Sequence, residues 1–111
     1  MTIPEIITRL QSLDEIRKLT PHEVSQYQLY LSANLWLAGD KIIETEMAYN
    51  ARWRLSRLEC KTDKECDKLA TQTPEYSTWR RAVYAEKSMV ETIRALKKML
   101  AQMSEQARNQ Y

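Results

Sequence analysis

Residues 74–108 read PEYSTWRRAVYAEKSMVETIRALKKMLAQMSEQAR and carry the most regular pattern in the 111-residue chain. Side chains of one set recur every seven residues: Trp79, Glu86, Ile93, Leu100 and Ala107. A second set with the same period is Ala82, Met89, Leu96 and Met103. Apolar residues at heptad spacing form the seam along which helices pack. The stretch therefore predicts a long helix over 74–108 that lies along a partner helix.

The partner is predicted in residues 21–60, where apolar residues recur at helical spacing. They are Val24, Tyr27, Leu31 and Leu35 in the first half, and Ile43, Met47, Ala51, Leu55 and Leu58 in the second. Gly39-Asp40 is the candidate break, with Gly39 as a C-cap and Asp40 as a new N-cap. The pattern leaves open one kinked helix or two helices, over about 21–38 and 40–60.

Length and charge favour pairing of these two segments as an antiparallel hairpin. They would span about 60 Å and about 50 Å, so they can run side by side. Residues 20–51 hold four acidic side chains against Lys41 alone, and residues 82–111 hold five basic against three acidic ones. We expect a coiled-coil-like hairpin that lays the acidic strip beside the basic one.

Local start signals place the remaining helices. Thr2-Ile3-Pro4-Glu5 begins a helix over about 3–19, whose apolar stripe must pack against the hairpin. Thr62-Asp63-Lys64-Glu65 is a capping box that begins a short helix over 63–70. With one glycine in the chain, a sheet built on tight turns is disfavoured. We predict a single all-α domain over 1–111.

The catalytic inventory is small. Phosphate-binding loops need several glycines, which argues against a nucleotide cofactor. His22 is the only histidine and is far from Cys60 and Cys66, so a four-ligand zinc site is not completed and no nucleophile–base pair is evident. We expect a protein that is not an enzyme, with no catalytic residue, no cofactor, no metal and two reduced thiols.

Basic and aromatic side chains gather between residues 52 and 81, at the turn end of the hairpin. The candidate contact residues for a partner or a nucleic acid are Arg52, Trp53, Arg54, Arg57, Lys61, Lys64, Trp79, Arg80 and Arg81. Basic groups neutralise phosphates and aromatic rings stack on bases, so single-stranded DNA is one predicted ligand. The alternative interpretation is that Trp53 and Trp79 cap the core while the charges stay solvated.

Glu86 is the one charged residue in the apolar heptad seam. A buried carboxylate needs a cation or water, so we expect a register-fixing contact, with Arg54 or Asn50 as candidate partners. The alternative is an exposed seam that binds a basic residue of another protein.

The surroundings of Trp36 predict a further contact. Leu35, Trp36 and Leu37 make their helix apolar on more than one face, which favours a third helix or a second subunit, and hence a homo-oligomer. The sequence has no membrane-length apolar run and no signal-peptide pattern at its start, so we expect a cytoplasmic protein without membrane contact.

Residues 35–108 resemble small helical-hairpin proteins encoded in the early replication and recombination regions of tailed bacteriophages. The resemblance rests on residues 59–65 (ECKTDKE), Leu69-Ala70, Tyr76, Tyr84, Glu86, residues 93–96 (IRAL), Leu100 and residues 105–108 (EQAR). It implies an accessory role in the cytoplasm of a host cell and supplies no functional residue.

Three functions remain open at this point. The first is a phage-type accessory protein that binds a phage or host protein, and single-stranded DNA, in replication or recombination. The second is an inhibitor of a host defence system that blocks an enzyme such as a CRISPR nuclease sterically. The third is a structural coiled-coil subunit of a larger assembly.

Overall fold

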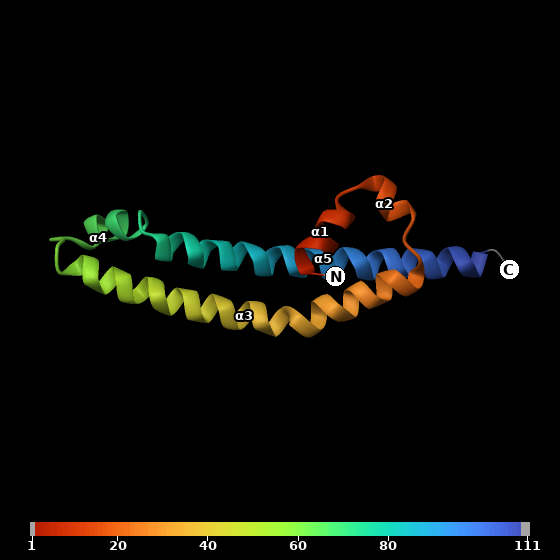
Figure 1. Ribbon diagram of the computed structural model, residues 1–111, viewed down its shortest axis with the longest axis horizontal. Helices are drawn as coiled ribbons and strands as arrows, with labels where there is room; N and C mark the ends of the chain where they lie inside the picture. The colour runs from red at the N-terminus through yellow and green to blue at the C-terminus, as the bar shows by residue number, and fades with distance from the viewer. Residues whose placement is uncertain (1, 110–111) are drawn as a thin grey trace. The chain divides into compact units, whose positions relative to one another are not determined.

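The computed structural model describes residues 2–109, and these contain five α-helices and no β-strand. The helices are α1 (Ile3–Leu10), α2 (Leu13–Arg17), α3 (Pro21–Arg57), α4 (Asp63–Ala70) and α5 (Pro74–Asn109) (Figure 1). The long helix α3 packs against α5 and against the short N-terminal helix. The predicted all-α class and the helical hairpin are confirmed.

Threonine caps begin the helices where the sequence predicted them. In α1 the Thr2 hydroxyl accepts from the Glu5 amide and the Glu5 carboxylate accepts from the Thr2 amide, both at 3.3 Å. Thr20 and Glu23 repeat this exchange at the start of α3. Thr62 caps α4 by accepting from the Glu65 amide at 3.2 Å. Each cap satisfies amide groups that lack a partner in the first helical turn.

One predicted helix is wrong, and one choice that the sequence left open is decided by the structure. Residues 3–19 do not form one helix, because Ser12 adopts an extended backbone and divides α1 from α2. The break lets Arg9 reach Glu15 at 3.2 Å and Glu23 at 3.0 Å. Of the two alternatives left open for residues 21–60, the structure has the single helix, since α3 is continuous from Pro21 to Arg57. Gly39 does not have the positive φ angle that a glycine C-cap adopts.

The other two helices agree closely with their prediction. The short helix spans 63–70 as expected, and α5 extends one residue beyond the predicted end at 108.

The chain groups into two compact units, and each is described by itself. The terminal unit contains the residues up to Leu35 and those from Ser88 onward, and the middle unit is Trp36–Lys87. The long helices α3 and α5 contribute to both units. The sequence had predicted a single domain.

The terminal unit has an apolar core formed by α1, α3 and α5. Its buried residues are Ile6, Leu19, Val24, Leu31, Met89, Ile93 and Leu96. The α5 members occupy predicted heptad positions, and Leu100 and Met103 farther along are half-buried. Ala107 is exposed, so the seam ends before the last heptad position.

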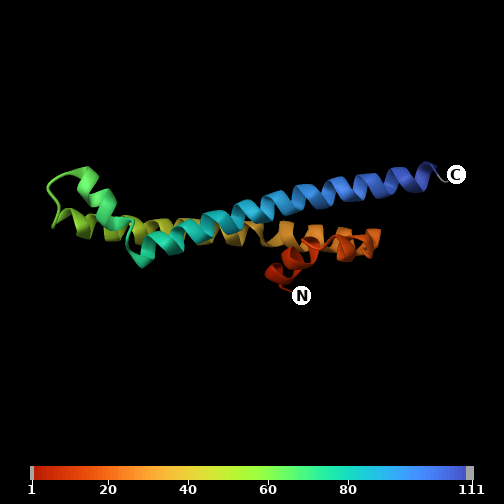
Figure 2. The same cartoon turned by 90° about the horizontal axis from the view of Figure 1, so that it is seen from above.

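The middle unit has a core of smaller side chains from α3, α4 and α5. Its buried residues are Thr45, Ser56, Cys66, Ala70, Thr73 and Ala82. The hydroxyls of Thr45 and Ser56 donate to carbonyls one turn earlier in α3, which satisfies them without leaving the helix. Figures 1 and 2 both show α4 beside the last turns of α3 and the first turns of α5.

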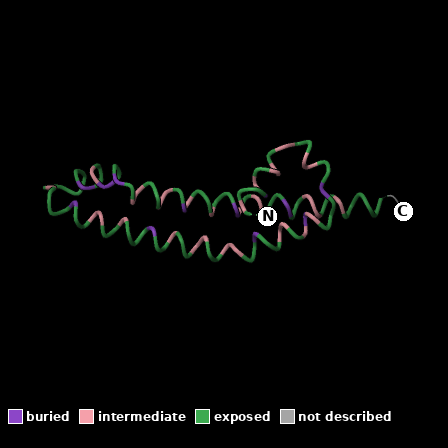
Figure 3. Tube along the Cα trace, in the orientation of Figure 1, coloured by how far each residue is buried: buried purple, intermediate pink, exposed green. Residues whose placement is uncertain are grey.

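For the second half of α3, the sequence predicted the wrong face of the helix to be buried. Ile43, Met47, Leu55 and Leu58 are 59%, 66%, 55% and 83% exposed. The face that packs inward instead carries Ala38, Ile42, Thr45, Tyr49 and Ser56. Figure 3 shows exposed positions along the side of this segment that is turned away from α5. Both faces have helical spacing, and the contacts with α5 and α4 decide which one is buried.

Candidate functional site

The predicted basic and aromatic cluster lies entirely in the middle unit, and its tryptophans are engaged in packing. Trp53 on α3 donates its indole N–H to Oδ1 of Asp67 on α4 at 2.8 Å. Trp79 on α5 stacks on Tyr49 of α3, with ring centroids 5.1 Å apart and 16° between planes. Tyr76 completes this aromatic group, 5.4 Å from Tyr49. These contacts agree with the interpretation of Trp53 and Trp79 as core caps.

Packing in the aromatic group also isolates polar atoms. The indole nitrogen of Trp79 and one carboxylate oxygen of Glu75 are buried without a hydrogen-bond partner among the described residues. Burial raises the pKa of the Tyr49 hydroxyl, because the phenolate would lose hydration there. The group therefore stabilises the start of α5 against α3, and its stacking surfaces are already used.

The basic residues of the cluster divide into a bound and a solvated set. Arg57 lies 3.7 Å from the Asp63 carboxylate and donates to the Cys66 sulfur at 3.9 Å. Arg80 lies over the rings of Trp79 and Tyr84, with centroid distances of 5.7 and 5.1 Å. Arg54, Lys61, Lys64 and Arg81 are exposed, and Arg52 is half-buried. In the predicted cluster the tryptophans, Arg57 and Arg80 thus contact other side chains, while most of the remaining basic residues are exposed to solvent.

Tyr84, an exposed aromatic residue beside the predicted contact residue Arg80, was not among the contact residues predicted from the sequence. Tyr84 is 58% exposed, and its hydroxyl accepts from Arg80 at 3.4 Å. The hydrogen bond and the positive charge of Arg80 lower the pKa of the Tyr84 hydroxyl. The spacing of the two residues by four positions on one helix was the available signal.

Glu86 is half-buried and lies beside Gly39 of α3. A Cβ atom on Gly39 would be 3.6 Å from Oε2 of Glu86. The predicted contact with Arg54 or Asn50 is wrong, because both of those residues are exposed and Gly39 occupies the facing position. A glycine leaves room for the carboxylate at this point of the hairpin.

Cys60 and Cys66 are free thiols at the turn end of the middle unit. Burial and the neighbouring Cys66 sulfur raise the pKa of the Cys60 thiol, so its reactive thiolate form is disfavoured. Among residues 2–109, no group of three or more His, Cys, Asp or Glu side chains is placed to hold a metal ion.

The outer face of α3 is an exposed, largely apolar surface of the middle unit. We use this name for Trp36, Asp40, Ile43, Met47, Ala51 and Arg54, which follow one another at spacings of three and four, together with Leu58 in the turn directly after the end of α3 at Arg57. Trp36 is 64% exposed, comparable with Ile43 and Met47. Leu37 and Leu55, also exposed, flank the face. The hint in the sequence was the apolar run around Trp36.

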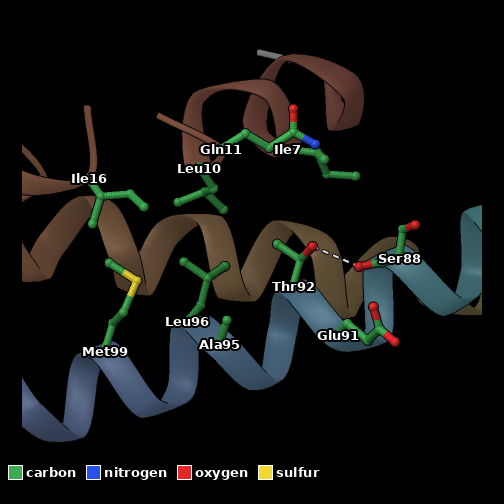
Figure 4. A pocket seen from close by; sticks show the side chains of 10 residues that line it. All are labelled: Ile7, Leu10, Gln11, Ile16, Ser88, Glu91, Thr92, Ala95, Leu96 and Met99. Atoms are coloured by element: carbon green, nitrogen blue, oxygen red, sulfur yellow. Dashed lines mark hydrogen bonds between the residues drawn. The ribbon is translucent and has the colours of Figure 1, made fainter. Parts of the chain in front are cut away.

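The terminal unit has an apolar cavity of about 320 Å³ between the first two helices and α5. Figure 4 shows Leu10 and Ile16 pointing toward Leu96 and Met99 across it. The nearby Thr92 hydroxyl donates to the Ser88 carbonyl at 2.7 Å and so has its hydrogen bond satisfied. Six of its ten lining residues are apolar and the others are Gln11, Ser88, Glu91 and Thr92, so the cavity is suited mainly to an apolar side chain.

The helices were compared with the length and apolar character of a membrane-spanning helix. None of the helices formed by residues 2–109 has both the length and the apolar character required to span one.

Comparisons of the chain with models of protein families, with curated proteins and with solved structures find no match.

Proposed function

We propose that this protein acts without catalysis, by protein–protein contact, and that the outer face of α3 is its docking surface. One observation carries the proposal: α3 has two apolar faces, and within the middle unit only one of them is covered. Trp36, Ile43 and Met47 expose more than half of their surface on the uncovered face. Contiguous exposed apolar side chains on a small protein are typical of an interaction site.

The composition of the outer face supports docking. Tryptophan and methionine are enriched at protein interfaces, because a large ring or a flexible thioether gains much contact when it is desolvated. Asp40 and Arg54 interrupt the apolar row and supply charges that can orient a partner. A partner helix could therefore bury the row and pair both charges.

The finer role that we propose is that of an accessory protein in phage replication or recombination, which is supported by the sequence resemblance described above. A steric inhibitor of a host defence enzyme would use the same surface in the same way.

Site-specific photo-crosslinking tests the docking surface. A photoreactive amino acid is introduced at Met47 on the outer face, or at Lys87, which is exposed on α5 and serves as the matched control. On irradiation in the producing cell, we expect a covalent protein adduct from position 47 and little from position 87. Absence of an adduct at 47, or equal yields at both positions, would contradict the proposal.

A second candidate function is binding of single-stranded nucleic acid, favoured by the exposed ring of Tyr84 beside Arg80 and Arg81. A solvent-exposed aromatic ring next to guanidinium groups can stack on a base while the cations contact phosphates. The rings of Trp53 and Trp79 are already engaged within the protein. We therefore propose that Tyr84, and not the tryptophans, stacks on a base.

Fluorescence anisotropy with a labelled single strand at low salt tests this candidate. We expect binding that weakens with added salt and falls several-fold in Tyr84→Ala, since stacking contributes about 1–3 kcal/mol per base. Tyr30→Ala, at an exposed tyrosine outside both proposed surfaces, is the matched control. Binding that is unchanged by Tyr84→Ala, or absent at low salt, would exclude the candidate.

A further inference from the structure

We infer that the outer face of α3 docks against the same face of a second copy of this chain, antiparallel, with Met47 on the two-fold axis. The inference rests on the proposed docking function and names the partner. It is argued from the spacing, the charges and the accessibility of residues in the middle unit.

The spacing of the outer face is symmetric about Met47. Reading outward in either direction, the next positions of the face are four, seven and eleven residues away, at Ile43 and Ala51, Asp40 and Arg54, and Trp36 and Leu58. In an antiparallel two-fold pair of helices, a residue lies opposite the residue equally far on the other side of the axis. Every position of the face is therefore opposed by another position of the face.

The charges on this face have opposite signs at equivalent positions. Asp40 and Arg54 are each seven residues from Met47, and both are exposed. The ion pairs of the middle unit involve Lys41 with Glu44 and Arg57 with Asp63, so neither charge is paired among the described residues. In the antiparallel dimer Asp40 of each copy lies opposite Arg54 of the other copy, so the interface contains two ion pairs. A parallel dimer would instead place like charges together, which is unfavourable.

The apolar positions next to the axis are complementary in size. Ile43 is opposed by the small Ala51, whereas the ends of the face bring together two large apolar residues, Trp36 and Leu58, the latter 83% exposed in the turn after α3. Alternation of large and small side chains across facing positions allows close packing of two helices. The flexible side chain of Met47 meets its own copy at the axis, where it can adjust to fill the space.

The surrounding structure leaves this face accessible. In the middle unit, α4 and the first turns of α5 lie along one side of α3 (Figure 1), and every residue of the outer face is exposed. Exposed positions follow the free side of this segment (Figure 3). The helical part of the face, from Trp36 to Arg54, is about 27 Å long, five turns of helix, which corresponds to a small interface. We therefore expect a reversible dimer whose population rises with protein concentration.

Charge reversal tests the pairing. By sedimentation, we expect D40R and R54D each to weaken the dimer at least about tenfold, the effect of losing about 1.4 kcal/mol. An equimolar mixture of D40R and R54D should form a heterodimer, because both interfacial pairs are then restored, and D40R/R54D should self-associate like the natural chain. E46R, an acid-to-arginine change on an exposed residue outside the face, should leave the dimer unchanged.

Cysteine crosslinking tests the register, in a chain that carries Cys60→Ser to remove the half-exposed thiol. M47C should form an oxidised dimer with itself. I43C should not, but a mixture of I43C and A51C should. Self-crosslinking of I43C in preference to the mixture would overturn the antiparallel arrangement.

The failures of the two proposals are distinguishable. A chain that stays monomeric at high concentration, or a dimer insensitive to both charge reversals, overturns the self-pairing. If photo-crosslinking at position 47 then yields adducts with other proteins only, the docking function stands and its partner is different. If position 47 yields no adduct, the docking function fails as well.

Discussion

Gly39 of α3 faces Glu86 of α5 so closely that a Cβ atom on the glycine would lie 3.6 Å from the carboxylate oxygen. The one glycine of the chain is thus opposite the one charged residue of the predicted heptad seam. The distance is an ordinary van der Waals contact, and Gly39 does not have a positive φ angle. A methyl group therefore fits at this position without displacing the carboxylate.

Gly39→Ala should stabilise the protein by about 0.5–1 kcal/mol, because alanine loses less backbone entropy in a helix interior than glycine. Chemical denaturation followed by circular dichroism measures the change. Ala33→Gly, at an exposed position of the same helix, is the reverse exchange and should destabilise by a similar amount. Loss of stability in Gly39→Ala would mean that Glu86 needs the space of the missing side chain.

A matched pair of leucines tests which face of α3 is buried in the terminal unit. Leu31 is 0% exposed and Leu29 is 68% exposed. Leu31→Ala should cost about 2–5 kcal/mol, since it removes buried contacts and leaves a cavity. Leu29→Ala should change the free energy of unfolding by no more than about 0.5 kcal/mol. Equal effects in denaturant titrations would contradict the packing of α3 described above.

The cavity in the terminal unit can be filled from α5. Ala95 lines it beside Leu96 and Met99. Ala95→Leu should place apolar atoms against Leu10 or Ile16 and raise stability by about 1 kcal/mol, as cavity-filling changes commonly do. Ala85→Leu, at an exposed position of the same helix, is the control and should have a smaller effect. A decrease in melting temperature for Ala95→Leu alone would show that the cavity cannot accept a larger side chain.

Acid should destabilise the terminal unit through Glu23. The Thr20 amide, together with Arg9, donates to the Glu23 carboxylate and holds its pKa below the ordinary value of 4.5. A carboxyl group whose pKa is lower in the folded state favours folding when it is ionised. This stabilisation is present above the unfolded-state pKa and is lost as pH falls through the folded-state pKa.

The measurement is the thermal midpoint as a function of pH, compared between the natural chain and Glu23→Gln. The midpoint of the natural chain should fall on acidification below about pH 4.5 more steeply than that of the variant, because glutamine does not titrate. Parallel curves for the two proteins would rule out a contribution from Glu23.

The positions where helices begin were predictable from the sequence because capping is local. A threonine and a glutamate three residues later exchange hydrogen bonds across a single turn, whatever the rest of the chain does. The starts at Thr2 and Thr62 were therefore found, and so was the seam at Met89, Ile93 and Leu96, whose period continues over several turns. Local hydrogen bonding and heptad spacing together determined the all-α class.

Burial on the second half of α3 was decided only by tertiary structure. Its two faces both have apolar side chains at helical spacing, so periodicity could not tell the inner Ile42 from the outer Ile43. The break at Ser12 and the packing of Trp53 and Trp79 were likewise set by partners distant in sequence, namely Glu23, Asp67 and Tyr49. A sequence records which faces are apolar, but which one is covered depends on where the other helices lie.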